Sequence, residues 1–197
     1  LDEPSADLVA HLAHPNGWWR DNAQKLLIVR NDRSVAPALR AMMRDHADPR
    51  ARMHAMWTLH GLNLLRSEGL VGCLADEDPR CRAAAVRASE TALMNDAPLG
   101  VRDAVAALAT DERVQVALQV LRTALYTQLP GYEALVRGVV DAHPDNEAVA
   151  GTARGYFARI ERERAEAAKR AAIAAENAAL ADAMHRGATI YKSLCFT

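Results

Sequence analysis

The chain has 197 residues, of which 50% are hydrophobic and 25% are charged, and its formal net charge is −1. This composition excludes a disordered chain, and the absence of a basic excess argues against nucleic acid as the main partner. No apolar run approaches the roughly 20 residues of a membrane-spanning helix. Glycine, proline and aromatic residues are sparse and alanine is abundant, which favours helices. Because the sequence starts at Leu1 with neither Met nor a signal peptide, we expect an internal piece of a longer protein or a processed product.

Four segments of the chain share one pattern, a short polar turn followed by a helix with Arg or Gln near its start and small residues inside. Their spacing is regular: Pro15 to Pro49 is 34 residues, Pro49 to Pro79 is 30, and Asp78 to Asp111 is 33. Pro is favoured in the first helical turn, and an Asp in front of it caps the helix. The four segments cover residues 14–23, 48–55, 78–85 and 111–118.

Shorter apolar-periodic segments lie between these helices, and we expect each to form the other helix of a hairpin. One hairpin cannot bury its apolar face alone, so neighbouring hairpins must stack. The sequence Asp-Pro-Arg-x-Arg, at 48–52 and 78–82, is similar to the start of short HEAT repeats. Residues 1–145 are therefore predicted to form an all-α, right-handed α-solenoid of about four short HEAT-like hairpins. The additional helices are expected at about 5–13, 34–45, 67–75, 99–110 and 130–142.

Two adjacent tryptophans stand at the start of the first repeated segment. On a helix they point about 100° apart, so the core of one repeat can hardly bury both. In one interpretation Trp19 is a core residue and Trp18 covers the end of the solenoid. In the other, Trp18 docks onto a preceding domain, because Trp and Arg are enriched at such contacts. The interface candidates are Trp18, Trp19, Arg20 and Asp21, and Trp57 and His60 could extend the patch.

Patterns for catalysis or metal binding are weak in this sequence. His11 and His14 could share a helix face, but no carboxylate completes a metal site. No P-loop, G-x-S-x-G or G-x-G-x-x-G motif occurs. The acidic clusters 76–78 and 111–112 stand at helix starts, where the helix dipole favours them structurally. We therefore predict no catalytic residue and no metal ligand.

The chain has three cysteines, and two of them lie close together in the sequence. Cys73 and Cys81 could pair, but small and apolar residues at helical spacing around each favour buried free thiols. The two cysteines lack the spacing of a zinc site. Cysteine usage alone therefore leaves the redox compartment open.

Residues 146–186 differ in character from the rest of the chain. No Pro occurs after 146, Ala alternates with charges of both signs, and pairs such as Glu166 and Arg170 have the spacing of helix-surface ion pairs. We predict one long, lightly buried helix that acts as a solvated connector. In a more specific interpretation, the helix is a rigid spacer that sets the distance to a following domain. Gly187 could end or kink this helix before a second one begins.

The stretch 187–197 reads Gly-Ala-Thr-Ile-Tyr-Lys-Ser-Leu-Cys-Phe-Thr. It resembles the first helix of c-type cytochromes, which leads into C-x-x-C-H, where two thiols attach the haem and the His is an axial ligand. Only Cys195 of that motif lies within the chain. The resemblance implies that Cys195 is the first haem-attachment cysteine of an incomplete motif, at the start of a truncated cytochrome c domain over 187–197. This chain alone is then expected to bind no cofactor.

The segment 8–27, Leu-Val-Ala-His-Leu-Ala-His-Pro-Asn-Gly-Trp-Trp-Arg-Asp-Asn-Ala-Gln-Lys-Leu-Leu, resembles part of large secreted bacterial proteins of the planctomycete and verrucomicrobial kind. These are similar to glucose/sorbosone-type dehydrogenases and combine a quinone-type β-propeller, a HEAT-repeat region and a C-terminal cytochrome c domain. Residues 56–62, Met-Trp-Thr-Leu-His-Gly-Leu, are similar to the second-repeat helix of that family, and 187–195 to the start of its haem domain. The resemblance implies a periplasmic or otherwise exported location, with haem c and a quinone such as PQQ in the parent protein.

The function expected from this resemblance is a non-catalytic scaffold or linker. It would position the propeller relative to the haem domain of a sugar or alcohol dehydrogenase, with these two domains of the same polypeptide as its partners. One alternative is a stand-alone HEAT-repeat module that binds a protein on its concave surface. Another is a lyase- or hydrolase-like enzyme built on short HEAT repeats, which would need a groove with converging acid, base or Cys groups.

Overall fold

The computed structural model describes residues 2–95, 99–127 and 131–195, and the side chains in these ranges except those of 99 and 187–195. Every regular element in the described ranges is a helix, which confirms the all-α prediction. The chain divides into two compact units, Leu1–Ala153 and Arg154–Thr197. The first unit extends past the predicted boundary at 145 because Val149 and Ala153, in the first turns of the last helix, are buried.

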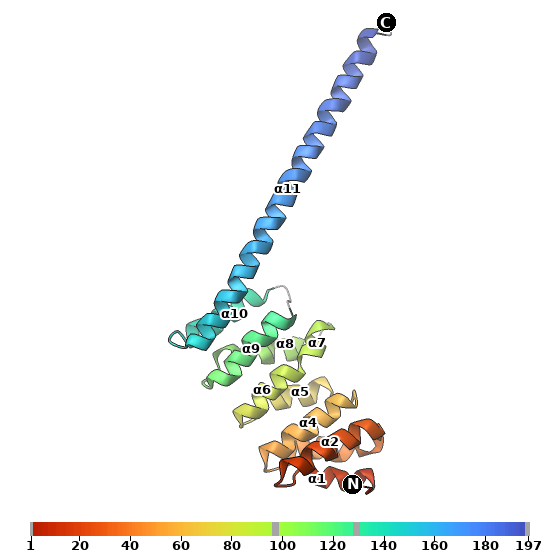
Figure 1. The fold of residues 1–197 in the computed structure, drawn as a ribbon, viewed down its shortest axis with the longest axis vertical. Coiled ribbons are helices and arrows are strands. Elements are labelled where there is room, and N and C mark those ends of the chain that lie inside the picture. Colours follow the sequence, from red (N-terminus) through yellow and green to blue (C-terminus); the bar gives the residue numbers. More distant parts are fainter. Residues whose placement is uncertain (1, 96–98, 128–130, 196–197) are drawn as a thin grey trace. The chain divides into compact units, whose positions relative to one another are not determined.

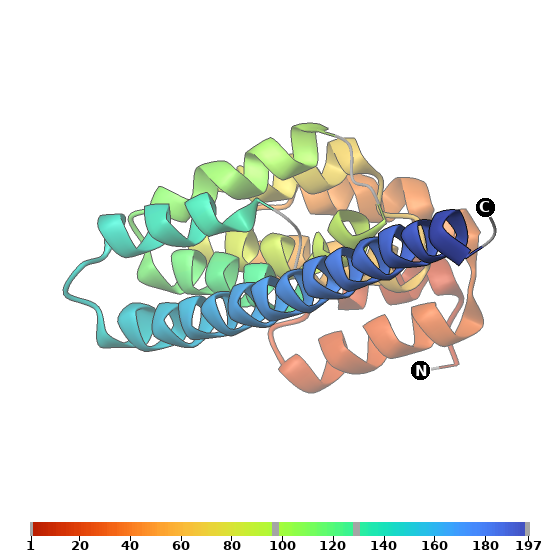
Figure 2. The same cartoon turned by 90° about the horizontal axis from the view of Figure 1, so that it is seen from above.

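Helices of the first unit pair in chain order (Figure 1 and Figure 2). The five helices expected between the repeated segments begin within two residues of their expected starts, whereas α7 was not predicted. The pairs are α1 (Ser5–His11) with α2 (Gly17–Arg30), α3 (Ala36–Asp45) with α4 (Pro49–Gly61), and α5 (Ser67–Leu74) with α6 (Pro79–Ala88). They are followed by α7 (Glu90–Met94), α8 (Leu99–Ala107), α9 (Val114–Thr127) and α10 (Tyr132–Ala142), with short 3-10 turns at Arg33–Val35 and Leu108–Thr110.

The core of this unit follows the second helices of the hairpins. Helix α2 contacts α4, α4 contacts α6, and α6 contacts α9. Each of the four contributes fully buried apolar side chains: Leu27, Leu59, Val86 and Leu121. A Cβ on Gly61 would lie 2.6 Å from Cδ1 of Ile28, so glycine lets α4 approach α2 closely. The repeated helices thus share one continuous apolar core.

The second unit consists of the greater part of α11 (Glu147–Cys195), whose described side chains from 161 to 186 are exposed. Ion pairs one turn apart support it, including Arg170 with Glu166 and Arg186 with Asp182. The helix continues through Gly187 without a break. A single glycine costs a helix about 1 kcal/mol, which a 49-residue helix rich in alanine can absorb. One long helix is therefore observed, and its backbone is longer than the predicted range 146–186.

Candidate functional site

The four turns that precede α2, α4, α6 and α9 are built on the same hydrogen bond. In each, the side chain three residues before the helix accepts the backbone N–H of the residue directly before the helix. His and Asp can share this position because Nδ1 of a neutral imidazole and a carboxylate oxygen are both acceptors. The bonds are His14 Nδ1 from Asn16 (3.0 Å), His46 Nδ1 from Asp48 (3.0 Å), Asp76 Oδ1 from Asp78 (2.8 Å) and Asp111 Oδ1 from Arg113 (2.9 Å).

Side chains at the residue directly before the helix cap three of these helices, and two of these caps, Asp48 and Asp78, were predicted from the sequence. Asn16 accepts the N–H of Trp18 at 2.9 Å, and Asp48 and Asp78 accept the corresponding groups of α4 and α6. Hydrogen bonds from the Arg50 guanidinium lower the pKa of Asp48 to about 2. Arg80 has the same effect on Asp78, whose pKa is also about 2. Both carboxylates therefore stay ionised, as caps require.

An arginine at the fourth residue of α2, α4 and α6 closes each turn from the other side. Its Nη1 donates to two backbone carbonyls of the preceding turn. These carbonyls need a hydrogen-bond donor from outside the turn, and the arginine provides it. The bonds run from Arg20 to His14 (2.6 Å) and Pro15 (2.9 Å), from Arg52 to His46 (2.8 Å) and Ala47 (3.3 Å), and from Arg82 to Asp76 (2.9 Å) and Glu77 (3.1 Å).

The same guanidiniums also tie each hairpin to the next one. Arg52 donates Nε and Nη2 to the two oxygens of Asp76 at 2.8 and 2.7 Å, and the two side chains are only 8% and 9% exposed. Arg82 and Asp111 form the equivalent pair at 2.7 and 3.0 Å. Burial raises the pKa of Asp111, but the hydrogen bond from Arg82 and the N–H of Arg113 outweigh it, so the pKa is lowered overall. We call Arg52–Asp76 and Arg82–Asp111 the inter-hairpin pairs.

Sequence reasoning missed the inter-hairpin pairs. It assigned the acidic clusters 76–78 and 111–112 to the helix dipole, whereas Asp76 and Asp111 bind an arginine of the preceding hairpin. A usable signal was present, since each Arg follows the helix-initial position at a fixed offset and each acid precedes the next helix by three residues.

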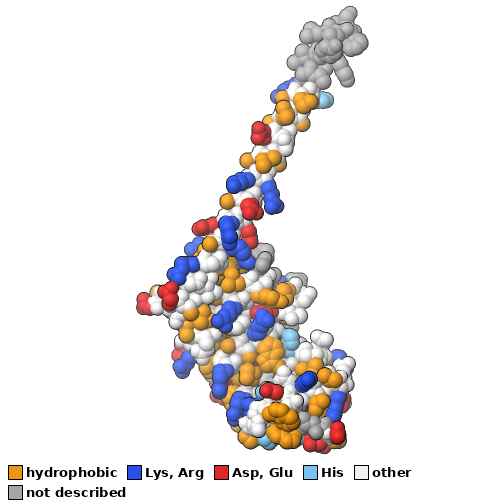
Figure 3. Space-filling view, in the orientation of Figure 1, with side chains coloured by type: hydrophobic (Ala, Val, Ile, Leu, Met, Phe, Trp, Pro, Cys, Tyr) orange, Lys and Arg blue, Asp and Glu red, His pale blue; other side chains and the backbone are white. Residues whose placement is uncertain are grey.

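The structure places the predicted interface candidates at the start of α2. Trp18 is 59% exposed, whereas Trp19 is half-buried and lies 5.1 Å from the ring of His11, so it lies against α1 and is not a core residue. The side chain of Arg20 already forms hydrogen bonds within the chain, to the preceding turn and, at 3.3 Å, to His54. Asp21 is exposed. Figure 3 shows hydrophobic side chains gathered on the surface of these N-terminal hairpins.

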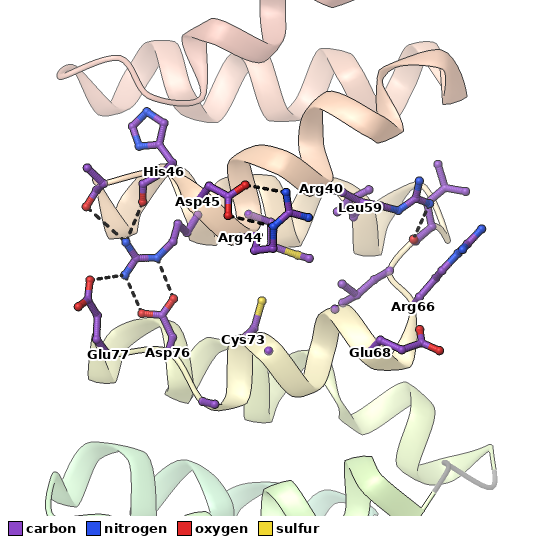
Figure 4. A pocket seen from close by; sticks show the side chains of 18 residues that line it. Arg40, Arg44, Asp45, His46, Leu59, Arg66, Glu68, Cys73, Asp76 and Glu77 are labelled. Carbon is purple, nitrogen blue, oxygen red and sulfur yellow. Dashed lines mark hydrogen bonds and ion pairs between the residues drawn. The ribbon is translucent and has the colours of Figure 1, made fainter.

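A cleft of about 840 Å³ lies between α3 and α5 (Figure 4). Its apolar lining includes Met43 of α3 and the fully buried Leu59 of α4. Helix α5 presents small residues to it: a Cβ on Gly69 would meet Cε of Met43 at 2.8 Å, and one on Gly72 would meet no atom within 4 Å. Glycine at position 69 therefore lets α5 approach Met43 closely, whereas open space remains beside Gly72.

The charges along the cleft differ between its two ends. At one end Arg44 pairs with Asp45 and Arg52 with Asp76. At the other end lie Arg40, Arg66 and Glu68 (Figure 4). Arg40 donates only a long 3.5 Å bond to the carbonyl of Leu64. In the described part of the chain, the side chains of Arg66 and Glu68 form no hydrogen bond or ion pair.

Cys73 also lines the cleft, but burial raises the pKa of its thiol to about 12. The thiol is therefore protonated near neutral pH and is a poor nucleophile. Cys81 is buried with a similarly raised pKa, and both are free thiols, as predicted. The most buried acid of the cleft, Asp76, is held by arginine.

Within the described ranges, no group of three or more His, Cys, Asp or Glu side chains is placed to hold a metal ion. No helix in these ranges has the combination of length and apolarity that crossing a bilayer would require. The side chain of Cys195 and residues 196–197 lie outside the described part, so the haem-attachment prediction is untested. No known protein family, curated protein or solved structure matches this chain.

Proposed function

We propose that this chain is a non-catalytic scaffold of short HEAT-like repeats. It would belong to an exported, multidomain, cytochrome c-containing dehydrogenase that acts on a sugar or alcohol. The observation that carries the proposal is the pair of buried bidentate ties, Arg52–Asp76 and Arg82–Asp111, which join successive hairpins. Such ties resist sliding and bending between hairpins, and a part that holds two domains at a fixed separation needs that resistance.

A solenoid of HEAT-like repeats is supported by two features of the first unit. The turns before α2, α4, α6 and α9 repeat the same hydrogen bond, and the helices that follow them contact one another in chain order. Each hairpin then needs its neighbours to bury its apolar face, which is the physical definition of a repeat protein.

The partners in this proposal are the propeller and the haem domain of the same polypeptide. Trp18 and Asp21 are the exposed members of the predicted contact with the propeller. Helix α11 reaches Cys195, where the haem domain would begin. Haem c, and a quinone such as PQQ, would belong to those domains, and the whole protein would work in the periplasm or outside the cell.

The test is to express the natural reading frame extended beyond Thr197 together with haem-maturation enzymes. We expect a haem absorption band that survives denaturation, because thioether bonds are covalent. A Cys195→Ala variant should lose one of the two thioethers, which the spectrum of the reduced haem in pyridine reports. A frame that does not continue into a second Cys and a His, or a protein without covalent haem, would refute the proposal.

A second candidate is a stand-alone HEAT-repeat module that binds a protein. The exposed Trp18 and the cleft between α3 and α5 favour it, because a pure spacer needs neither. The same extension experiment separates the two candidates: this one is supported if the natural frame ends without a haem motif and excluded if haem becomes attached.

A further inference from the structure

The cleft between α3 and α5 is a groove that opens to solvent, with a volume of about 840 Å³. Pockets for small molecules typically span about 300–1,000 Å³. The cleft is therefore of a size suited to a small ligand.

Gly72 on α5 leaves part of the cleft open at a cost in helix stability. Gly69 and Gly72 stand in the interior of α5, where each glycine costs about 1 kcal/mol relative to alanine. At Gly69 a Cβ would clash with Met43, but at Gly72 nothing within 4 Å opposes a larger side chain. An alanine or leucine at Gly72 would stabilise the helix and partly fill the cleft. Packing within the fold thus gives no reason for glycine at this position.

The end of the cleft that holds Arg40, Arg66 and Glu68 carries one unbalanced positive charge. Arg40 and Arg66 outnumber Glu68 at this end, whereas at the opposite end Arg44 and Arg52 lie with Asp45, Asp76 and Glu77, so the lining as a whole is balanced in charge. A ligand with a single negative charge would neutralise this end, whereas a doubly charged phosphate would leave an excess charge beside Glu68. Guanidinium groups match the planar geometry of a carboxylate.

We propose that the cleft binds a small amphiphilic carboxylate. Its carboxylate would lie at Arg40 and Arg66, and its apolar body would cover Met43, Leu65 and Cys73, which also line the cleft. Arg52 and Asp76 also line the cleft, but the ligand is placed at the opposite end, so its binding does not depend on the proposed scaffold function.

Isothermal titration calorimetry of the full chain with decanoate tests the proposal. We expect decanoate to bind, and Arg66→Gln to weaken binding by about tenfold, as the loss of one charge-assisted contact would. Gly72→Leu should abolish binding while keeping the helical circular dichroism, because leucine favours a helix and occupies the cleft. Arg50→Gln is the matched control: this arginine is exposed and outside the cleft, and binding should not change.

Neutral and doubly charged probes test the choice of ligand. Decanol and decyl phosphate should both bind more weakly than decanoate. In protein labelled with ¹³C at the methionine methyl groups, decanoate should shift the Met43 signal but not that of Met184, which is exposed on α11. Absence of decanoate binding, equal binding by Gly72→Leu, or tighter binding of decanol or decyl phosphate would each overturn the proposal.

Discussion

Replacing Arg52 by Met removes one of the two inter-hairpin pairs while keeping an unbranched side chain of similar length. The substitution deletes two bonds to Asp76 and two to backbone carbonyls. Asp76, whose side chain is 9% exposed, then keeps only the N–H of Asp78 as a hydrogen-bond donor. Removing one partner of a buried ion pair costs about 3–5 kcal/mol, because the other charge is left without compensation.

Urea denaturation followed by circular dichroism measures this cost. With a slope of about 1–3 kcal/mol per molar urea, a loss of about 3–5 kcal/mol in Arg52→Met should lower the midpoint by roughly 1–5 M. Adding Asp76→Asn should restore part of the loss, because asparagine keeps the acceptor for the N–H of Asp78 but removes the uncompensated charge. The double variant is therefore expected to be more stable than Arg52→Met alone.

Arg50 provides the matched control, two residues away on the same helix. It also forms a bidentate pair, with Asp48, but its side chain is 47% exposed and its pair is screened by water. Arg50→Met should leave the midpoint nearly unchanged. Two results would contradict this account of the inter-hairpin pair Arg52–Asp76. One is a midpoint that Arg52→Met shifts no more than Arg50→Met does. The other is a double variant that is less stable than Arg52→Met.

Three further substitutions address other parts of the chain. Burial lowers the pKa of His54 below its ordinary value of 6.5. As the pH falls below 6.5, this histidine takes up a proton more readily in the unfolded than in the folded chain, so the free energy of unfolding declines. His54→Gln should flatten this decline, which urea titrations at several pH values measure. Gly61→Ala should destabilise the protein by about 1–3 kcal/mol, because its Cβ would overlap Ile28 of α2, and an unchanged urea midpoint would contradict this. Gly155→Ala should instead stabilise α11 by about 1 kcal/mol, since no atom lies within 4 Å of its Cβ; a loss of helical signal on heating at or below the wild-type temperature would disagree.

Local sequence signals predicted the helices well. Asp48 and Asp78, each followed by Pro, mark helix starts because a cap and a proline both satisfy the geometry of the first turn. The composition of α11 predicted a long helix for the same local reason. The sequence did not predict whether Gly187 breaks that helix, because a single glycine changes the free energy of helix formation by only about 1 kcal/mol.

Contacts between hairpins were not predicted, because the recurring Arg and Asp positions do not by themselves say which of them meet. Arg52 and Asp76 are 24 residues apart, and their pairing depends on how α4 and α6 stack. The cleft likewise depends on the separation of α3 and α5, which no single segment encodes. Gly72 lines the cleft, but a glycine inside a short helix does not predict a cleft unless the position of the neighbouring helix is known.

The most direct test of the scaffold proposal is the mass of the denatured, purified protein produced from the natural reading frame extended beyond Thr197, with haem-maturation enzymes present. A mass increase equal to one haem, carried on the peptide that contains Cys195, would place this chain directly before a cytochrome c domain. An unmodified Cys195 peptide, from cells that attach haem to another c-type cytochrome under the same conditions, would contradict the proposal.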